Sequence, residues 1–130
     1  MNILLPILKI FLCTSLLAGA VIDSDKIRLG SLLTFSEERG DAVAVVNSRT
    51  VYKSIPEYKI IVKEKVEKGS ARYTQLMSEC TKKYTSAVSQ AAKQKYVLVV
   101  EVGGISGYPT RDITDSVISK LAYIKHGEED

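Results

Sequence analysis

The sequence predicts an α+β fold, in which a small antiparallel β-sheet carries an inserted α-helical hairpin and a C-terminal amphipathic helix. Residues 97–102 form an apolar, largely β-branched run that is interrupted by Glu101 and suits a buried strand. Residues 57–95 repeat apolar side chains at helical spacing. A second strand-like run, residues 42–47, precedes the helical segment, so the two strands pair if the helices fold back on each other. Asn47-Ser48 at its end offers a cap for the helical turns that follow.

Around the longer strand, the sequence predicts a β-hairpin. Gly103-Gly104 favours a turn, because glycine adopts positive φ at little steric cost. Residues 105–108 then form a short returning strand that Pro109 ends. Side chains of the longer strand alternate between two faces, with Val97, Val99 and Glu101 on one and Leu98, Val100 and Val102 on the other.

After the hairpin, the sequence predicts an amphipathic helix. Asp112 is a suitable N-cap, and Asp115 adds negative charge to the first turn. The apolar stripe of this helix consists of Ile113, Val117, Ile118, Leu121 and Ala122, with Ile124 as a further candidate.

The helical segment divides into two arms at Gly69-Ser70. The second arm carries an unbroken heptad seam made by Tyr73, Met77, Cys80, Tyr84, Ala87 and Ala91. This seam fails when it is traced back past Gly69, which predicts two helices rather than one. Each arm is expected to hold roughly 20 to 25 residues, a length of about 30 to 37 Å. Glu64–Lys68 and Glu79–Lys83 are spaced to form ion pairs along the helices.

Residues 1–20 have the character of a secretory signal peptide. The uncharged stretch 10–20 ends in Ala18-Gly19-Ala20, a small-x-small pattern that predicts cleavage after Ala20. An uncleaved membrane anchor is the alternative, although Lys9 leaves the uncharged part short for a membrane span. Export would place the protein in the periplasm. The mature chain would keep one cysteine, Cys80, which leaves no intrachain disulfide.

The 130 residues suit a single domain behind this signal. Residues 21–41 are predicted to form an N-terminal extension, with a short strand or helix followed by a loop. Residues 42–130 are predicted to form the domain itself. Its body comprises residues 42–55 and 96–125, and its helical hairpin comprises residues 56–95.

Two stretches resemble the Skp/OmpH-like family of periplasmic chaperones. The first, AVAVVNSRTVYKSIPEYK at residues 42–59, combines a strand ending V-x-N with a V-Y-x-x-x-P-E-x-K turn. The second, residues 96–121, closes on D-I-T-D-x-V-I-x-K-L. Together they cover about 45 residues, on either side of a charged helical segment.

The resemblance implies a homotrimer, in which a small β body carries helical prongs around a cavity. It also implies a non-enzymatic chaperone or holdase that binds unfolded outer-membrane or envelope proteins without ATP or another cofactor. The helical middle of this chain is far shorter than the arms typical of the family, which weakens the client-holding role more than the trimeric body. The alternative is an oligomeric structural adaptor of the cell envelope, whose short prongs bind one folded partner.

Candidate contact residues follow from these expectations. The trimer body would assemble through Val43, Val45, Val97, Leu98, Val99, Val100, Val102 and Ile105, because a small sheet leaves open edges. Apolar client contacts would come from Tyr58, Ile61, Val62 and Tyr73. Attraction to acidic clients or to an acidic membrane surface would come from Lys63, Lys65, Lys68, Arg72, Lys82 and Lys83. Packing between the arms is the competing interpretation of the apolar residues, and a solvated helix face is that of the basic ones.

The helical segment is basic, since residues 53–95 hold nine Lys and one Arg against four Glu, a balance of +6. Export argues against nucleic acid as the partner. Catalysis finds little support, because His126 lies near the C-terminus and no histidine is placed to activate Cys80. There is no His/Cys cluster or spaced acidic loop for a metal, and Gly103–Gly107 fits no nucleotide fingerprint. No catalytic residue, metal ligand or cofactor is therefore assigned.

Overall fold

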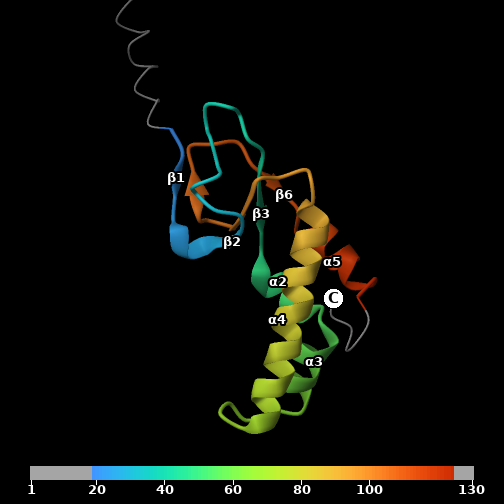
Figure 1. The fold of residues 1–130 in the computed structure, drawn as a ribbon. Coiled ribbons are helices and arrows are strands. Elements are labelled where there is room, and N and C mark those ends of the chain that lie inside the picture. The colour runs from blue at the N-terminus through green and yellow to red at the C-terminus, as the bar shows by residue number, and fades with distance from the viewer. Residues whose placement is uncertain (1–18, 125–130) are drawn as a thin grey trace, which may run out of the picture.

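The computed structural model describes residues 19–124 (Figure 1). The predicted signal peptide, apart from its last two residues, lies outside the described residues, as do His126 and the acidic C-terminus. The elements are, in chain order, β1 (Val21–Ile22), a 3-10 turn (Ser24–Lys26), β2 (Ile27–Leu29), β3 (Val43–Val46), α2 (Ser48–Lys53), α3 (Pro56–Lys63), α4 (Ala71–Ala92), β4 (Leu98–Glu101), β5 (Ile105–Ser106), β6 (Arg111–Asp112) and α5 (Thr114–Leu121). The mixture of helices and small sheets confirms the α+β class. The predicted cut after Ala20 would fall directly before β1, and the cut itself stays a prediction.

The main sheet has four strands in the order β2-β4-β3-β6. Its central pair, β3 and β4, is parallel, with Val43 opposite Leu98 and Val45 opposite Val100. β6 also runs parallel to β3, whereas β2 is antiparallel to β4. The predicted antiparallel pairing of the two apolar strands is therefore wrong, although the prediction that they pair is correct.

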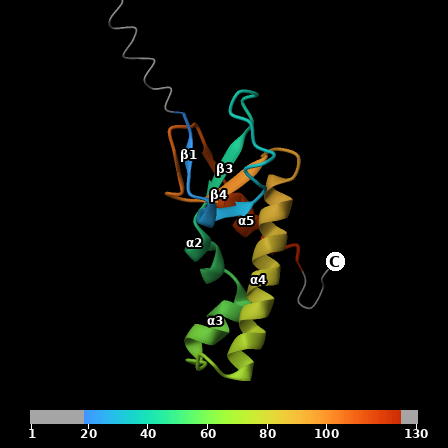
Figure 2. The same cartoon turned by 60° about the vertical axis from the view of Figure 1, so that its left-hand side comes forward.

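The helices explain how the central strands become parallel. A parallel pair requires a crossover of a dozen or more residues, because the chain must return to the edge at which the first strand began. α2 and α3 lead away from the sheet, and α4 returns past both of them to the start of β4 (Figures 1 and 2). With 22 residues, α4 is about 33 Å long, whereas α3 has 8 residues. Two arms of similar length were expected, but a parallel return requires the second helix to be longer.

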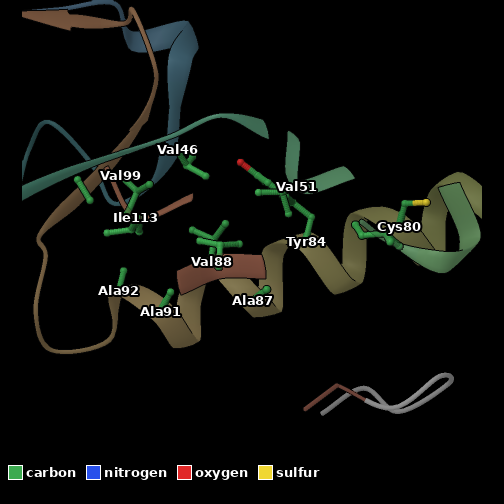
Figure 3. Close-up of a cluster of buried hydrophobic side chains, with 13 residues drawn as sticks. Val46, Val51, Cys80, Tyr84, Ala87, Val88, Ala91, Ala92, Val99 and Ile113 are labelled. Atoms are coloured by element: carbon green, nitrogen blue, oxygen red, sulfur yellow. The ribbon is translucent and has the colours of Figure 1, made fainter. Parts of the chain in front are cut away.

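One face of the sheet packs against the helices. Ala44 and Val46 of β3 and Val99 of β4 lie in a buried cluster with α2, α4 and α5. In Figure 3, Val88 and Ala92 of α4 lie on the side of the helix that faces Val46 and Val99, whereas Cys80 lies farther along the helix. The predicted heptad seam provides most of the α4 side chains of this cluster: Cys80, Tyr84, Ala87 and Ala91 are buried, and Tyr73 and Met77 are half-buried. Val88 and Ala92, which lie outside the seam, are buried in the same cluster.

The opposite face of the sheet is covered in part by residues 21–41, which were expected to form an extension, and in part by the segment that follows β4. Val43, Leu98 and Val100 are buried there, and the side chains that pack over them are Ile22, Ile27, Phe35, Ile105 and Tyr108. The rings of Phe35 and Tyr108 meet edge to face with centroids 5.3 Å apart. Val99 lies on the other face of the sheet from Leu98 and Val100, which confirms that the side chains of this strand alternate between two faces as predicted.

The predicted hairpin after β4 is wrong, because the short strand β5 does not pair with β4. β5 pairs with β1 in a separate two-stranded sheet, with Ile105 opposite Ile22. The turn itself is present, since the Gly104 amide donates to the Glu101 carbonyl at 2.8 Å. Gly104 also allows close packing, because a Cβ there would lie 2.6 Å from the Cβ of Lys26 and 2.7 Å from a methyl of Val100. This turn therefore directs the chain across the sheet face rather than back along β4.

Side-chain caps connect the strand ends to the helices. Asn47 caps α2, as expected, by accepting a hydrogen bond from the Thr50 amide at 3.2 Å. Asp112 lies one residue before the N-cap position of α5, and its carboxylate accepts from the Thr114 amide at 2.9 Å and from the Thr114 hydroxyl at 2.6 Å. The Thr114 hydroxyl oxygen accepts in turn from the Asn47 amide at 2.9 Å, which fixes the start of α5 to the end of β3.

Candidate functional site

The end of the helical projection is the main candidate for a functional surface. It comprises the second half of α3, the connecting loop and the first turns of α4, and we call residues 60–76 the helical tip. In both views it extends well beyond the sheet (Figures 1 and 2). The predicted break is present, since Gly69 has a φ of 90° and the Ser70 side chain caps α4 by accepting from the Tyr73 amide at 3.1 Å.

The end of α3 is closed by a backbone motif. The Val66 amide donates to the Ile61 carbonyl at 3.0 Å, and the Lys65 amide donates to the Val62 carbonyl at 3.3 Å. This pairing is a Schellman motif, which requires a left-handed residue after the helix. Lys65 occupies that position with a φ of 49°, where glycine is the usual residue. The motif holds Lys65 in an exposed position on the tip.

Most of the predicted basic contact residues are exposed. Lys63, Lys65, Lys68, Arg72 and Lys82 all face solvent. Arg72 forms an ion pair with Glu64, at 2.6 Å between its guanidinium and the carboxylate, in place of the expected Glu64–Lys68 pair. Among the described residues, no carboxylate lies within ion-pair distance of Lys63, Lys65 or Lys68.

Lys83 is an exception, because it is buried. Its ammonium donates to both carboxylate oxygens of Glu57 at 3.0 Å, and the two side chains are 9% and 5% exposed. The pair joins α4 to α3 and replaces the predicted Glu79–Lys83 pair. Lys83 is therefore part of the interior and does not belong to a surface that attracts clients.

Cys80 lies one helical turn before this pair and is fully buried. Burial, together with the nearby negative charge of Glu57, raises the pKa of its thiol to about 11. The thiol is therefore protonated at neutral pH and lacks the thiolate that a nucleophile needs. This agrees with the prediction that Cys80 is a core residue.

The predicted apolar contact residues, like the basic ones, include both buried and exposed side chains. Ile61 is 8% exposed, and Tyr58 packs against the core with its ring 6.0 Å from that of Tyr52. Tyr73 is half-buried, whereas Val62 is 60% exposed. Ile61 and most of Tyr58 therefore pack between the arms, and Val62 is the most exposed apolar residue of the set.

Half of the predicted assembly residues are buried within the single chain. Val43, Leu98, Val99 and Val100 are buried, Val45, Val97 and Ile105 are half-buried, and Val102 is 47% exposed. β3 and β4 each have a partner strand on both sides. The buried residues of the set are therefore occupied within the chain, and the outer strands of the main sheet are β2 and β6. Contact between copies through the remaining residues stays a prediction.

A polar cluster that the sequence analysis missed lies at the carboxyl ends of β3 and β4. Glu101 accepts hydrogen bonds from the Ser48 amide at 2.9 Å, from the Ser48 hydroxyl, and from the Arg28 guanidinium at 3.0 Å. The Ser48 hydroxyl also contacts the Tyr84 hydroxyl. Burial raises the pKa of Tyr84. Burial would also raise the pKa of Glu101, but the hydrogen bonds from Ser48 and Arg28 outweigh it and the pKa is lowered.

This cluster connects four elements and leaves its members hydrogen-bonded to each other. Within the described residues, no buried side-chain polar atom lacks a hydrogen-bond partner. The arrangement therefore fastens β2, β4, α2 and α4 together. A signal for it was available, since Glu101 is the one charge in an apolar strand and a buried carboxylate requires partners.

Other kinds of site were also sought over residues 19–124. No group of three or more His, Cys, Asp or Glu side chains there is placed to hold a metal ion. No helix in that part of the chain is long and apolar enough to cross a membrane. Comparison with protein-family models, with curated proteins and with solved structures finds no match to this chain.

Proposed function

We propose that the protein is a non-enzymatic binding protein of the cell envelope, and that its helical tip contacts a protein partner. One observation carries the proposal: the tip extends beyond the packed body and presents Val62 beside Lys63, Lys65 and Lys68. These three lysines have no acidic partner among the described residues. An exported, periplasmic location rests on the predicted signal peptide.

The composition of the tip favours an acidic partner with an apolar anchor point. Exposed charges are screened beyond about 8 Å at physiological salt, so the lysines act mainly on the rate of encounter. Burial of Val62 against the partner then lowers the rate of dissociation. An acidic membrane surface would satisfy the charges as well, but a narrow projection with one largely exposed apolar residue, Val62, suits a protein surface better.

The adaptor form of this function is favoured over the holdase form. A holdase for unfolded outer-membrane proteins requires several apolar contacts that act together. Tyr58 and Ile61, two of the four expected contacts, pack largely within the chain. The tip of one chain therefore offers a small apolar surface, which suits one folded partner. A holdase would need several copies to enclose a client.

Self-assembly, including the homotrimer implied by the resemblance, stays part of the proposal with a changed interface. The outer strands β2 and β6 have three and two residues, and each leaves one edge of the main sheet without a further strand among those described. Open edges favour pairing with another chain. Native mass spectrometry of the mature protein tests for self-assembly directly. A monomer at micromolar concentration would contradict the homotrimer.

The test of the tip uses a photo-crosslinking amino acid at position 62 in cells that produce the full chain. A single adduct of defined mass supports the adaptor, whereas a ladder of many envelope proteins supports the holdase. The yield of this adduct should fall when Lys63, Lys65 and Lys68 are changed to Gln. The matched control changes Lys26, Lys53 and Lys93, which are also exposed, to Gln. Equal crosslinking by both triple variants would contradict the role of the basic tip.

A further inference from the structure

A hollow opens at the other end of α4 from the helical tip. It lies where the last turn of α4 and the first turn of α5 meet strand β6, and its volume is about 620 Å³. The floor is apolar, because Ala91 and Ile113 line it and are 5% and 4% exposed. Both belong to the core cluster of Figure 3. The small side chain of Ala91 leaves space at this point of the helix.

The loop that ends α4 provides one wall of the hollow. Gln94 has a φ of 59°, and the amides of Lys95 and Tyr96 both donate to the Ala92 carbonyl, at 2.9 and 3.1 Å. This tight turn places Lys95 and the half-buried Tyr96 on the rim. The wall therefore combines a cation with an aromatic ring.

A second cation, Arg111 of β6, also lines the hollow. Among the described residues, neither Lys95 nor Arg111 has a carboxylate within ion-pair distance. Asp112 also lines the hollow, but its carboxylate is engaged with the amide and hydroxyl of Thr114. Ser116 completes the rim with an exposed hydroxyl. The rim thus carries two cations against one carboxylate that is already hydrogen-bonded.

We propose that this hollow binds a small organic anion, a carboxylate or phosphate group carried on an apolar or aromatic body. Ligand pockets of about 300 to 1,000 Å³ typically bring a few convergent polar groups together with apolar surface. The lining of this hollow is mainly polar, with a smaller apolar part at Ala91 and Ile113. The Arg111 guanidinium matches the paired oxygens of a carboxylate or phosphate, and Lys95 adds a point charge. The ring of Tyr96 and the floor at Ala91 and Ile113 would contact the body of the ligand. This site is separate from the helical tip and does not depend on the function proposed for it.

The test titrates the full-length mature protein with four probes while amide chemical shifts are followed by NMR. Phenyl phosphate and benzoate carry both features, inorganic phosphate carries the charge alone, and benzyl alcohol carries the ring alone. We expect saturable shifts at Ile113 and Ser116 with the first two probes, and at least tenfold weaker binding of the last two. A difference between phenyl phosphate and benzoate identifies which anionic group the rim prefers.

Matched variants separate the site from general charge effects. Ser116→Glu places a negative charge on the rim and should weaken binding at least tenfold, whereas Ser119→Glu makes the same change elsewhere on α5 and should not. Arg111→Gln should weaken binding similarly, and Arg49→Gln on α2 is its control. The absence of saturable shifts with any probe would overturn the proposal. So would equal binding of inorganic phosphate and phenyl phosphate, or equal losses in each variant and its control. Circular dichroism establishes that each variant is folded.

Discussion

The two halves of α4 carry one continuous heptad seam but have different surroundings. In residues 80–92, which we call the covered half, the seam packs against the sheet, α2 and α5. In residues 71–79, the open half, α3 is the neighbouring helix, and Tyr73 and Met77 remain half-buried. The same periodic pattern therefore makes a core where a sheet faces it and a partly exposed surface where it extends beyond the sheet.

The two ion pairs between α3 and α4 show the same contrast. Lys83–Glu57 is at the covered half, with both side chains less than a tenth exposed. Arg72–Glu64 is at the open half, with side chains 57% and 47% exposed. Attraction between charges is strong in a buried environment and weak in water. The covered half should therefore determine stability, and the open half is free to serve binding.

The largest expected effect is a charge placed in the covered half. Val88→Asp would bury a carboxylate among apolar side chains at a residue that is 1% exposed, which costs several kcal/mol. Because domains are stable by about 5 to 15 kcal/mol, we expect this variant to be largely unfolded. Met77→Asp in the open half should remain folded with a lower urea midpoint. Urea denaturation followed by circular dichroism compares them, and similar midpoints would contradict the division of α4.

The next effect concerns the ion pairs. Lys83→Met removes the ammonium that both Glu57 oxygens contact, and loss of one partner of a buried pair costs about 3–5 kcal/mol. Arg72→Met removes an exposed partner and should cost less than about 1 kcal/mol. Chemical denaturation measures both. If the cost of Lys83→Met comes from the remaining carboxylate, the double variant Glu57→Gln/Lys83→Met should recover part of it. Equal effects of the two single variants would show that burial does not distinguish the pairs.

The fold could be predicted from sequence where the pattern is local. The α4 seam, the break at Gly69 and the cap at Asn47 depend on residues close in the chain. The direction of β3 relative to β4 does not. The sequence did contain an indication of the parallel direction, because continuous apolar runs are typical of parallel strands that are covered on both faces. The cover for the second face comes from Phe35 and Tyr108, whose meeting depends on the tertiary fold.

The candidate sites were less predictable for a similar reason. Spacing along a helix pairs Lys83 with Glu79, but Lys83 points toward α3 and meets Glu57, 26 residues away. The hollow beside Ala91 depends on Arg111, which only the position of β6 brings near Lys95. The exposed lysines of the tip were found from sequence, because the loop around Gly69 exposes its charged residues in any packing of two helices.

A moderate effect is expected from the pH dependence of the polar cluster around Glu101, which reaches the covered half through Ser48 and Tyr84. The folded-state pKa of Glu101 lies below its ordinary value of 4.5, so the ionised form stabilises the protein above that pH. This contribution is lost as the pH falls from about 4.5 through the lowered folded-state pKa. Glu101→Gln should be less stable than the wild type at pH 7, and the difference should shrink towards pH 3. Urea midpoints between pH 3 and 7 measure this, and a constant difference across that range would contradict the role of the Glu101 charge.

The smallest effect lies at the open half, where backbone conformation rather than burial determines the outcome. Lys65 adopts a left-handed conformation that costs an ordinary residue roughly 1–2 kcal/mol, whereas glycine adopts it freely. Glycine also gains conformational freedom in the unfolded chain, which offsets about 0.4–1 kcal/mol of that gain. Lys65→Gly should therefore stabilise the protein by about 0.5 kcal/mol, although it removes a basic residue from the tip.

Gly69→Ala is the matched opposite change. Open space surrounds that position, but its φ of 90° is strained for alanine, so a small loss of stability is expected. Urea midpoints of the two variants should move in opposite directions. If both midpoints fall, the Lys65 side chain stabilises the protein by more than its left-handed backbone destabilises it. The left-handed conformation of Lys65 would then not lower the stability of the tip.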